Sequence, residues 1–205
     1  MNSRLEEFAS VVSHDLRNPL NLAKGRLQLA QETCESEHLD NVAQALDRME
    51  ALIEDLLSLA QAGKQISKTE PVALGALCES SWQSVATADA TLVVETERQI
   101  RADRSRLRQL LENFFRNAIE HGGEHVTVTV DELDTGFYVE DDGPGIPTDE
   151  RTQCFEAGYS TTEEGTGLGL SIVKQIVDAH NWRIHLTDGT TGGTRFEITN
   201  VEFSQ

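Results

Sequence analysis

The stretch LDNVAQALDRMEALIEDLLSLA, Leu39–Ala60, decides the first part of the fold. Its apolar residues recur at alternating steps of three and four positions, and they are Leu39, Val42, Leu46, Met49, Ile53, Leu56 and Ala60. This spacing is a heptad repeat, which lines up an apolar stripe along one side of a helix. We therefore expect a helix here that packs its stripe against another helix.

A second apolar stripe lies earlier in the chain, from Leu5 to Ala30, and the polar segment CESEHLD separates it from the first. Two helices joined in this way form a hairpin, which by itself leaves much of each stripe exposed to water. Pairing two hairpins into a four-helix bundle would bury both stripes. The pattern therefore predicts a homodimer through residues 1–64. The alternative is that the stripes pack against the rest of the same chain.

After residue 64 the composition changes, and helical segments alternate with β-rich segments. We expect helices at 74–86, 103–122 and 167–180, and strands at 91–97, 125–133, 136–141, 183–188 and 194–202. The segment HVTVTVDELDTGFYVED suits a β-hairpin, so the sheet should not be purely parallel. We predict an α+β chain: an antiparallel two-helix hairpin in 1–64, then an α/β sandwich in 65–205 with a mixed sheet covered by helices on one face.

The composition and charge of the chain argue against several classes of protein and partner. Thirty-five acidic residues against 17 basic ones give a net charge of −18, which disfavours nucleic acid and anionic membranes as partners. Three distant cysteines and six histidines show neither a disulfide framework nor zinc-type spacing. The chain has no apolar run of about 18–20 residues, and its start lacks signal-peptide features. We therefore expect a cytoplasmic protein without membrane contact of its own.

The polar stretch SHDLRNPLN, 13–21, interrupts the first stripe. His14 and Asn18 share a helical face that points away from the stripe, so the imidazole should be exposed and available as a nucleophile. Asp15 can accept the N–H of the ring or orient it, and Pro19 should bend the helix because it donates no backbone hydrogen bond. The alternative is an ordinary surface histidine beside a kink.

Two further motifs carry candidate ligands. In LENFFRNAIEH, Asn113 and Asn117 lie four residues apart on one helix, where two amides can hold Mg²⁺ and phosphate oxygens. In VEDDGPGIP, Asp141 precedes Gly143 and Gly145, which permit close backbone approach, and its carboxylate can accept a hydrogen bond from an exocyclic amine such as that of adenine. The alternatives are two surface asparagines and a tight turn.

The glycine-rich stretch GTGLGLSIV, 165–173, leads directly into a helix, whose first N–H groups favour phosphate. It is not G-x-G-x-x-G and no Lys-Ser/Thr follows, so the dinucleotide-binding and P-loop interpretations fail. The preceding residues 148–164 are polar apart from Cys154 and Phe155, which suits a lid anchored by one aromatic side chain.

In their order and spacing these motifs resemble those of the sensor histidine kinases of two-component signalling. SHDLRNPL resembles the phosphoacceptor box, NFFRNAIEH the N box, DDGPGIP the first glycine box, CFEAGYS the phenylalanine box and GTGLGLSIV the second glycine box. The resemblance covers nearly the whole chain. The acidic, lysine-poor composition is similar to that of the members from halophilic archaea.

The resemblance implies dimerising helices followed by the ATP-binding sandwich shared with gyrase-type and Hsp90-type ATPases. It implies that His14 takes the γ-phosphoryl group from ATP with Asp15 as base, and then passes it to an aspartate in the receiver domain of a response regulator. Asn18 matches the residue that orients a water when such kinases dephosphorylate their partner. Asn117 matches the Mg²⁺ ligand. The residues expected to line the nucleotide are Asn113, Asp141, Gly143, Gly145, Gly165, Thr166, Gly167, Leu168, Gly169 and Thr194.

The chain departs from the family pattern at charged positions. Glu120 and His121 stand where the family often has lysine and tyrosine, and the lid GYSTTEEG contains no lysine or arginine. Arg116 or Arg151 could supply the missing positive charge. These departures keep two alternatives open: a dimeric scaffold that senses nucleotide without transferring phosphate, and a response-regulator phosphatase without kinase activity.

Overall fold

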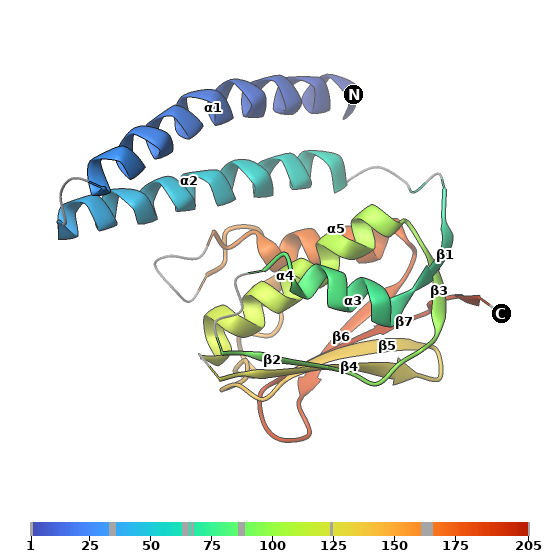
Figure 1. Ribbon diagram of the computed structural model, residues 1–205. Helices are drawn as coiled ribbons and strands as arrows, with labels where there is room; N and C mark the ends of the chain where they lie inside the picture. The colour runs from blue at the N-terminus through green and yellow to red at the C-terminus, as the bar shows by residue number, and fades with distance from the viewer. Residues whose placement is uncertain are drawn as a thin grey trace. The chain divides into compact units, whose positions relative to one another are not determined.

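The computed structural model describes residues 2–32, 36–62, 66, 68–85, 89–123, 125–160 and 166–204 (Figure 1). The chain divides into two compact units. The first contains Met1–Gln61 and Gly158–Leu168, and the second contains Ala62–Ala157 and Gly169–Gln205. Two long helices precede a domain with a mixed sheet, so the predicted α+β fold class is confirmed.

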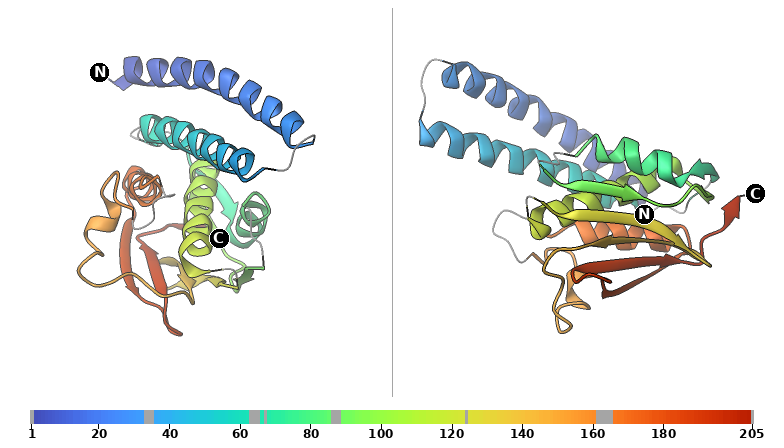
Figure 2. Two further views of the ribbon diagram at one scale, coloured as in Figure 1. Left: turned by 90° about the vertical axis from the view of Figure 1, so that its left-hand side faces the viewer. Right: turned by 60° about the horizontal axis from the view of Figure 1, so that its bottom comes forward.

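The first unit is built on two helices, α1 (Asn2–Gln31) and α2 (Glu37–Ala62). Helix α1 continues through Pro19 and curves along its length (Figure 2). Proline leaves one carbonyl without its usual helical donor, and curvature is the usual response. No described helix combines the length and the apolar content needed to cross a bilayer.

Polar contacts join the two helices of this hairpin. Lys24 on α1 forms an ion pair with Glu50 on α2, and near the turn Gln31 Nε2 donates to Asp40 Oδ1 at 3.0 Å. Leu20 and Ile53 are buried, with exposed fractions of 4% and 6%. Other large apolar side chains of the hairpin stay exposed, and they are Leu16, Leu22, Leu29, Val42 and Met49. A single chain therefore buries only part of its apolar stripes.

The second unit contains a five-stranded sheet in the order β2-β4-β5-β7-β6. The strands are β2 (Thr91–Val94), β4 (Thr127–Leu133), β5 (Gly136–Asp141), β6 (Arg183–Asp188) and β7 (Thr194–Thr199). β2 pairs with β4 in parallel, and the other neighbours are antiparallel, so the sheet is mixed as predicted. β4 and β5 form the predicted hairpin.

Three helices cover one face of this sheet (Figures 1 and 2). They are α3 (Leu74–Trp82), α4 (Arg104–Gly122) and α5 (Gly169–Ala179). Alternating strand residues such as Val128, Val130, Val139 and Ile198 point into the core because successive side chains of a strand face opposite sides. Phe114 of α4 stacks on Phe196 of β7, with ring centroids 4.7 Å apart, and so ties helix to sheet.

A second, three-stranded sheet was not predicted. It consists of β1 (Glu70–Ala73), β3 (Gln99–Ala102) and β8 (Phe203–Ser204), in the order β1-β3-β8 and antiparallel throughout. These strands have two to four residues, too few for a clear alternating pattern, and they pair across long sequence separations.

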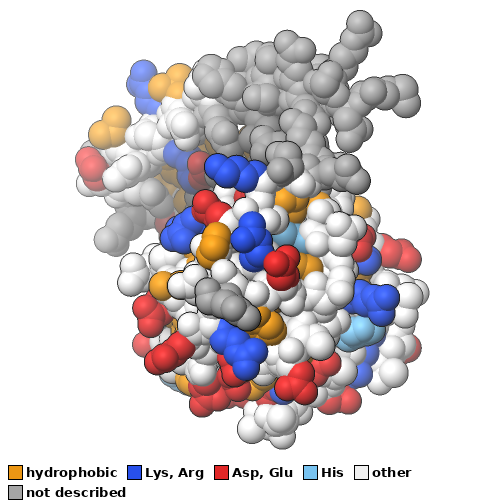
Figure 3. Space-filling view, turned by 90° about the vertical axis from the view of Figure 1, so that its right-hand side faces the viewer, with side chains coloured by type: hydrophobic (Ala, Val, Ile, Leu, Met, Phe, Trp, Pro, Cys, Tyr) orange, Lys and Arg blue, Asp and Glu red, His pale blue; other side chains and the backbone are white. Residues whose placement is uncertain are grey.

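On the face seen in Figure 3, acidic and basic side chains are interspersed.

His180 links α5 to the start of α4. Its Nε2 accepts a hydrogen bond from the backbone N–H of Asp103 at 3.1 Å, so Nδ1 carries the proton and donates to the carbonyl of Ile176 at 2.8 Å. The ring stacks on Trp182 with centroids 4.0 Å apart. Burial lowers the pKa of His180, while the Ile176 carbonyl and Asp103 oppose this effect. The neutral ring is therefore the form that the fold stabilises.

We predict that stability falls as the pH is lowered from about 7.5 to about 5.5, because the unfolded chain protonates His180 near its ordinary pKa of about 6.5 while the folded chain resists protonation. In a urea titration, His180→Gln should lower stability at about pH 7.5 by about 1 kcal/mol through the lost hydrogen bonds, and it should weaken the pH dependence. His185→Gln, at an exposed position of β6, is the control and should keep it. An unchanged pH dependence in His180→Gln would contradict this role.

Candidate functional site

Asp141, the last residue of β5, has a carboxylate whose two oxygens differ in their surroundings. Oδ1 accepts hydrogen bonds from the backbone N–H groups of Gly143 at 3.0 Å and Thr194 at 3.2 Å. Among the described residues, Oδ2 accepts none. The two N–H groups fix the orientation of the carboxylate and leave the hydrogen-bonding capacity of Oδ2 to a ligand that brings a donor.

The environment of this carboxylate disfavours its charge. Burial raises the pKa of Asp141, with smaller upward contributions from Asp142 and Glu140, while the hydrogen bonds from Gly143 and Thr194 oppose the shift. A desolvated carboxylate gains more from a donor than an exposed one does. An amine that meets Oδ2 would therefore form a strong hydrogen bond.

Backbone packs closely around Asp141. A Cβ atom on Gly143 would lie 2.8 Å from Gly122 Cα, and one on Gly193 would lie 2.1 Å from the carbonyl oxygen of Asp141. Gly145 and Gly193 have φ angles of +79° and +75°, which side chains rarely adopt. The predicted close approach at Gly143 and Gly145 is thus present, whereas Gly193 was not identified from the sequence. The GGT triplet before a predicted strand was the available signal.

The two asparagines of α4 lie beside the start of α5. A hydrogen bond from Nδ2 to the carbonyl of Gln109 at 2.8 Å orients the buried side chain of Asn113. The nearest atoms to a Cβ placed on Gly169 would be Asn113 Oδ1 at 3.1 Å and Asn117 Oδ1 at 3.4 Å. Asn117 Nδ2 is buried and has no hydrogen-bond partner among the described residues. Both amides therefore converge on the first turn of α5.

This arrangement fits a bound Mg²⁺ with phosphate. Mg²⁺ prefers oxygen ligands and keeps several of its waters, so one or two amide oxygens suffice. The unpartnered Nδ2 of Asn117 could donate to a phosphate oxygen, and the first N–H groups of α5 favour an anion. Among the described residues no group of three His, Cys, Asp or Glu side chains could hold a metal, so a metal site here depends on the amides.

The other glycine-rich residues belong to the first unit. Thr166 Oγ1 donates to Asp55 Oδ2 at 2.6 Å and accepts from the N–H of Leu168 at 3.3 Å. Gly167 has a φ of +67°, and its carbonyl accepts from the N–H of Gly158 at 2.9 Å. Gly165 lies outside the described residues.

The candidate phosphoacceptor lies on α1. His14 and Asp15 fall within this helix, but their side chains are outside the described part of the structure, so the exposure of His14 stays a prediction. Asn18, one turn later, is exposed as predicted.

Two residues flanking the expected lid have structural contacts. Phe155, in the short 3-10 helix Gln153–Phe155, meets Phe196 edge-on with centroids 6.4 Å apart, which matches the predicted aromatic anchor. Arg151 donates from Nε to the carbonyl of Ile146 at 3.1 Å and pairs with Asp188. Its guanidinium is therefore already occupied, which argues against Arg151 as a replacement for the missing lid cation.

Comparison with known families decides the assignment. Residues 102–204 match the family described as histidine kinase-, DNA gyrase B-, and HSP90-like ATPase, and residues 4–65 match the His Kinase A (phospho-acceptor) domain. The chain belongs to the sensor histidine kinases. Both matched domains contain the residues that the motifs singled out.

Individual relatives agree with this assignment. The histidine kinase is 32% identical to sporulation kinase A of Bacillus subtilis, over 94% of this chain and 34% of that protein. It is 33% identical to the sensor histidine kinase ZraS of Escherichia coli O157:H7, over 95% of this chain and 45% of ZraS. Full-length ShkA in complex with AMPPNP superposes with a TM-score of 0.72 at 27% identity, covering 97% of this chain and 46% of ShkA. The chain thus spans between a third and a half of the length of these relatives.

We predict that Gly193→Ala destabilises this histidine kinase more than Gly192→Ala does. Both glycines have positive φ angles, so both variants carry backbone strain of about 1 kcal/mol. Only the Cβ at 193 would collide with Asp141, whereas nothing lies within 4 Å of one at 192. The extra loss should be about 1–3 kcal/mol, the usual range for overpacking, measured by thermal and urea unfolding. Equal losses would contradict the close approach at Asp141.

Proposed function

We propose that the chain is the catalytic core of an ATP-dependent protein-histidine kinase, with residues 1–64 as dimerisation and phosphoacceptor hairpin and residues 65–205 as ATP-binding domain. The proposal rests on two features of the second unit: the Asp141 carboxylate and the pair of asparagine amides on α4. Asp141 offers Oδ2 to an amine, and Asn113 and Asn117 converge on the start of α5. Adenine and phosphate need these two kinds of contact.

In this proposal the exocyclic amine of adenine donates to Asp141 Oδ2. Asn117 would hold Mg²⁺ with Asn113 beside it, and the ion would neutralise phosphate charge when bound. The resemblance of the glycine boxes to those of the family assigns further residues to nucleotide binding, and they are Gly143, Gly145, Gly165, Thr166, Gly167, Leu168, Gly169 and Thr194.

Phosphoryl transfer then takes place at His14. A ring nitrogen attacks the γ-phosphorus of ATP, so an N–P bond forms while the bond to the β,γ-bridging oxygen breaks and ADP leaves. Asp15 accepts the proton of the imidazole. The phosphoryl group passes onward to an aspartate in the receiver domain of a response regulator, and Asn18 orients a water when the regulator is dephosphorylated. The match of residues 4–65 to the phosphoacceptor domain supports these roles.

We further propose that the kinase is a homodimer through its hairpin. The exposed apolar side chains of α1 and α2, Leu16, Leu22, Leu29, Val42 and Met49, support this, because a second hairpin would cover part of this surface. The excess of acidic residues supports an origin in a salt-rich cytoplasm such as that of halophilic archaea, where screening weakens repulsion between the chain and ATP.

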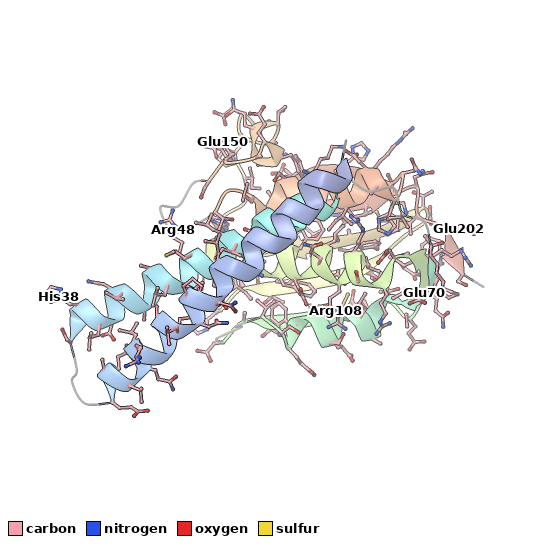
Figure 4. The ribbon with its side chains drawn as sticks, turned by 90° about the horizontal axis from the view of Figure 1, so that it is seen from above. His38, Arg48, Glu70, Arg108, Glu150 and Glu202 are labelled. Atoms are coloured by element: carbon pink, nitrogen blue, oxygen red, sulfur yellow. The ribbon has the colours of Figure 1, made fainter. Side chains whose placement is uncertain are left out.

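Incubation with γ-labelled ATP and Mg²⁺ should give a label that is acid-labile and base-stable, as expected of phosphohistidine. His14→Gln should abolish the label. His38→Gln, near the start of α2 (Figure 4), is the control and should keep it. Labelling that persists unchanged in His14→Gln would refute the assignment.

The same assay separates the alternatives. Tight ATP binding without any label would indicate the nucleotide-sensing scaffold, which the charge departures at Glu120 and the occupied Arg151 favour. Removal of phosphate from a phosphorylated receiver, persisting in His14→Gln, would indicate a phosphatase without kinase activity.

The dimer has its own test. Met49 is 51% exposed, and Met49→Glu would place a charge inside the proposed interface, where burial without a partner costs about 3 kcal/mol. The dimer should weaken about a hundredfold, measured by sedimentation equilibrium. Asn41→Glu adds the same charge at an exposed polar position of α2 and should leave the dimer intact. Equal behaviour of the two variants would contradict an interface at Met49.

A further inference from the structure

Glu140, the neighbour of Asp141 on β5, is a buried carboxylate on the sheet face opposite the core residue Val139. Only 6% of it is exposed. Its Oε1 accepts from the backbone N–H of Thr190 at 2.7 Å and from the hydroxyl of the same residue, and its Oε2 pairs with Arg195 Nη1 at 3.1 Å. Burial acts to raise the pKa of Glu140, but the bonds from Thr190 and Arg195 outweigh it and lower the pKa. Glu140 is therefore held as an anion with its oxygens occupied.

Thr190 begins a tight loop whose other end meets Asp141. The loop is closed by hydrogen bonds between the N–H of Gly189 and the carbonyl of Gly193 at 3.3 Å, and between the N–H of Gly192 and the carbonyl of Gly189 at 3.4 Å. Gly193 packs on the Asp141 backbone, and the N–H of Thr194 donates to Asp141 Oδ1. Glu140 therefore binds one end of the loop at Thr190, and its neighbour Asp141 binds the other end at Thr194.

Arg195 gives this anchor rigidity. Its Nε donates to Glu197 Oε1 at 3.0 Å, and its guanidinium carbon lies 3.5 Å from the centroid of the Tyr138 ring. A guanidinium held by two carboxylates and an aromatic face has little freedom. Glu140 therefore presents a fixed acceptor to Thr190.

We propose that Glu140 is a positioning residue for the recognition of adenine: by holding the loop through Thr190, it keeps the Thr194 N–H on Asp141 Oδ1 and Oδ2 turned toward the base. The inference rests on the proposed function, since it assigns Asp141 to the adenine amine. If Thr190 is released, the Thr194 N–H moves and the Asp141 carboxylate can rotate.

The consequence is a change in base discrimination. ATP presents an amine at position 6 of the purine, whereas ITP presents a carbonyl there, which cannot donate to Asp141. A loosened Asp141 therefore weakens the binding of ATP and leaves that of ITP nearly unchanged. A general loss of folding would weaken both.

The experiment measures dissociation constants of the 205-residue chain for ATP and ITP by calorimetry, with the melting temperature of each variant. Glu140→Ala should weaken ATP binding about tenfold, the equivalent of one hydrogen bond, and change ITP binding less than about twofold. Glu197→Ala is the matched control, because it removes the other carboxylate that binds Arg195 but leaves both hydrogen bonds from Thr190 to Glu140 in place, with Arg195 still held by Glu140 and the Tyr138 ring. It should preserve the ATP preference.

Two further variants distinguish the loss of this contact from misfolding. Glu140→Gln keeps an acceptor for both Thr190 donors, so it should keep much of the ATP preference. Thr190→Val keeps the side-chain shape but removes the hydroxyl, so it should lose part of the ATP preference. In an Asp141→Asn background, Glu140→Ala should cause no further loss of ATP affinity, because both changes act on one contact.

The outcomes are distinguishable. A wild-type chain that does not prefer ATP over ITP would overturn the assignment of Asp141 and with it this inference. A wild-type preference that survives in Glu140→Ala and Thr190→Val, or equal losses of ATP and ITP affinity in these variants, would overturn the role of Glu140 alone.

Discussion

The two carboxylate oxygens of Asp141 have different partners, and the site depends on this difference. Two backbone N–H groups from different segments bind Oδ1, and this leaves Oδ2 without a described partner. The segments can approach only because glycine stands at 143 and 193. The mixed sheet serves this arrangement, since it sets the end of β5 beside the start of β7, whose residues lie more than 50 positions apart in sequence.

The positions of Asn113 and Asn117 depend on how α4 packs against the sheet and α5. Helical periodicity alone puts Asn113 and Asn117 on one face of α4, but the stacking of Phe114 on Phe196 and the packing of α5 decide what that face meets. The apolar core therefore does more than stabilise the unit. It fixes the distance between the amides and the first turn of α5, where the backbone N–H groups of the helix favour anions.

Much of this could be predicted from the sequence. β-rich segments identified the five strands of the main sheet, and helical patterns identified α3, α4 and α5 but not the 3-10 helix Gln153–Phe155. The strands β1, β3 and β8 were not predicted because each contains at most one β-branched residue, whereas β2 contains three, and because their partners are distant, as in the pairing of Ile100 with Phe203. Three residues could not be predicted because their roles arise from contacts across 50 residues or more, and they are Gly193, Glu140 and Thr190. The motifs located Asp141, but only the fold shows which of its oxygens is occupied.

We propose that Asp141 Oδ2 binds the amine of adenine while the amides of α4 face the phosphates. A crystal structure of this chain with ADP and Mg²⁺ tests it most directly. We expect the exocyclic nitrogen about 3 Å from Asp141 Oδ2, with Oδ1 still bound to the N–H groups of Gly143 and Thr194, and the metal beside Asn117. Adenine bound away from Asp141, or held there through Oδ1 after loss of the Thr194 bond, would contradict it.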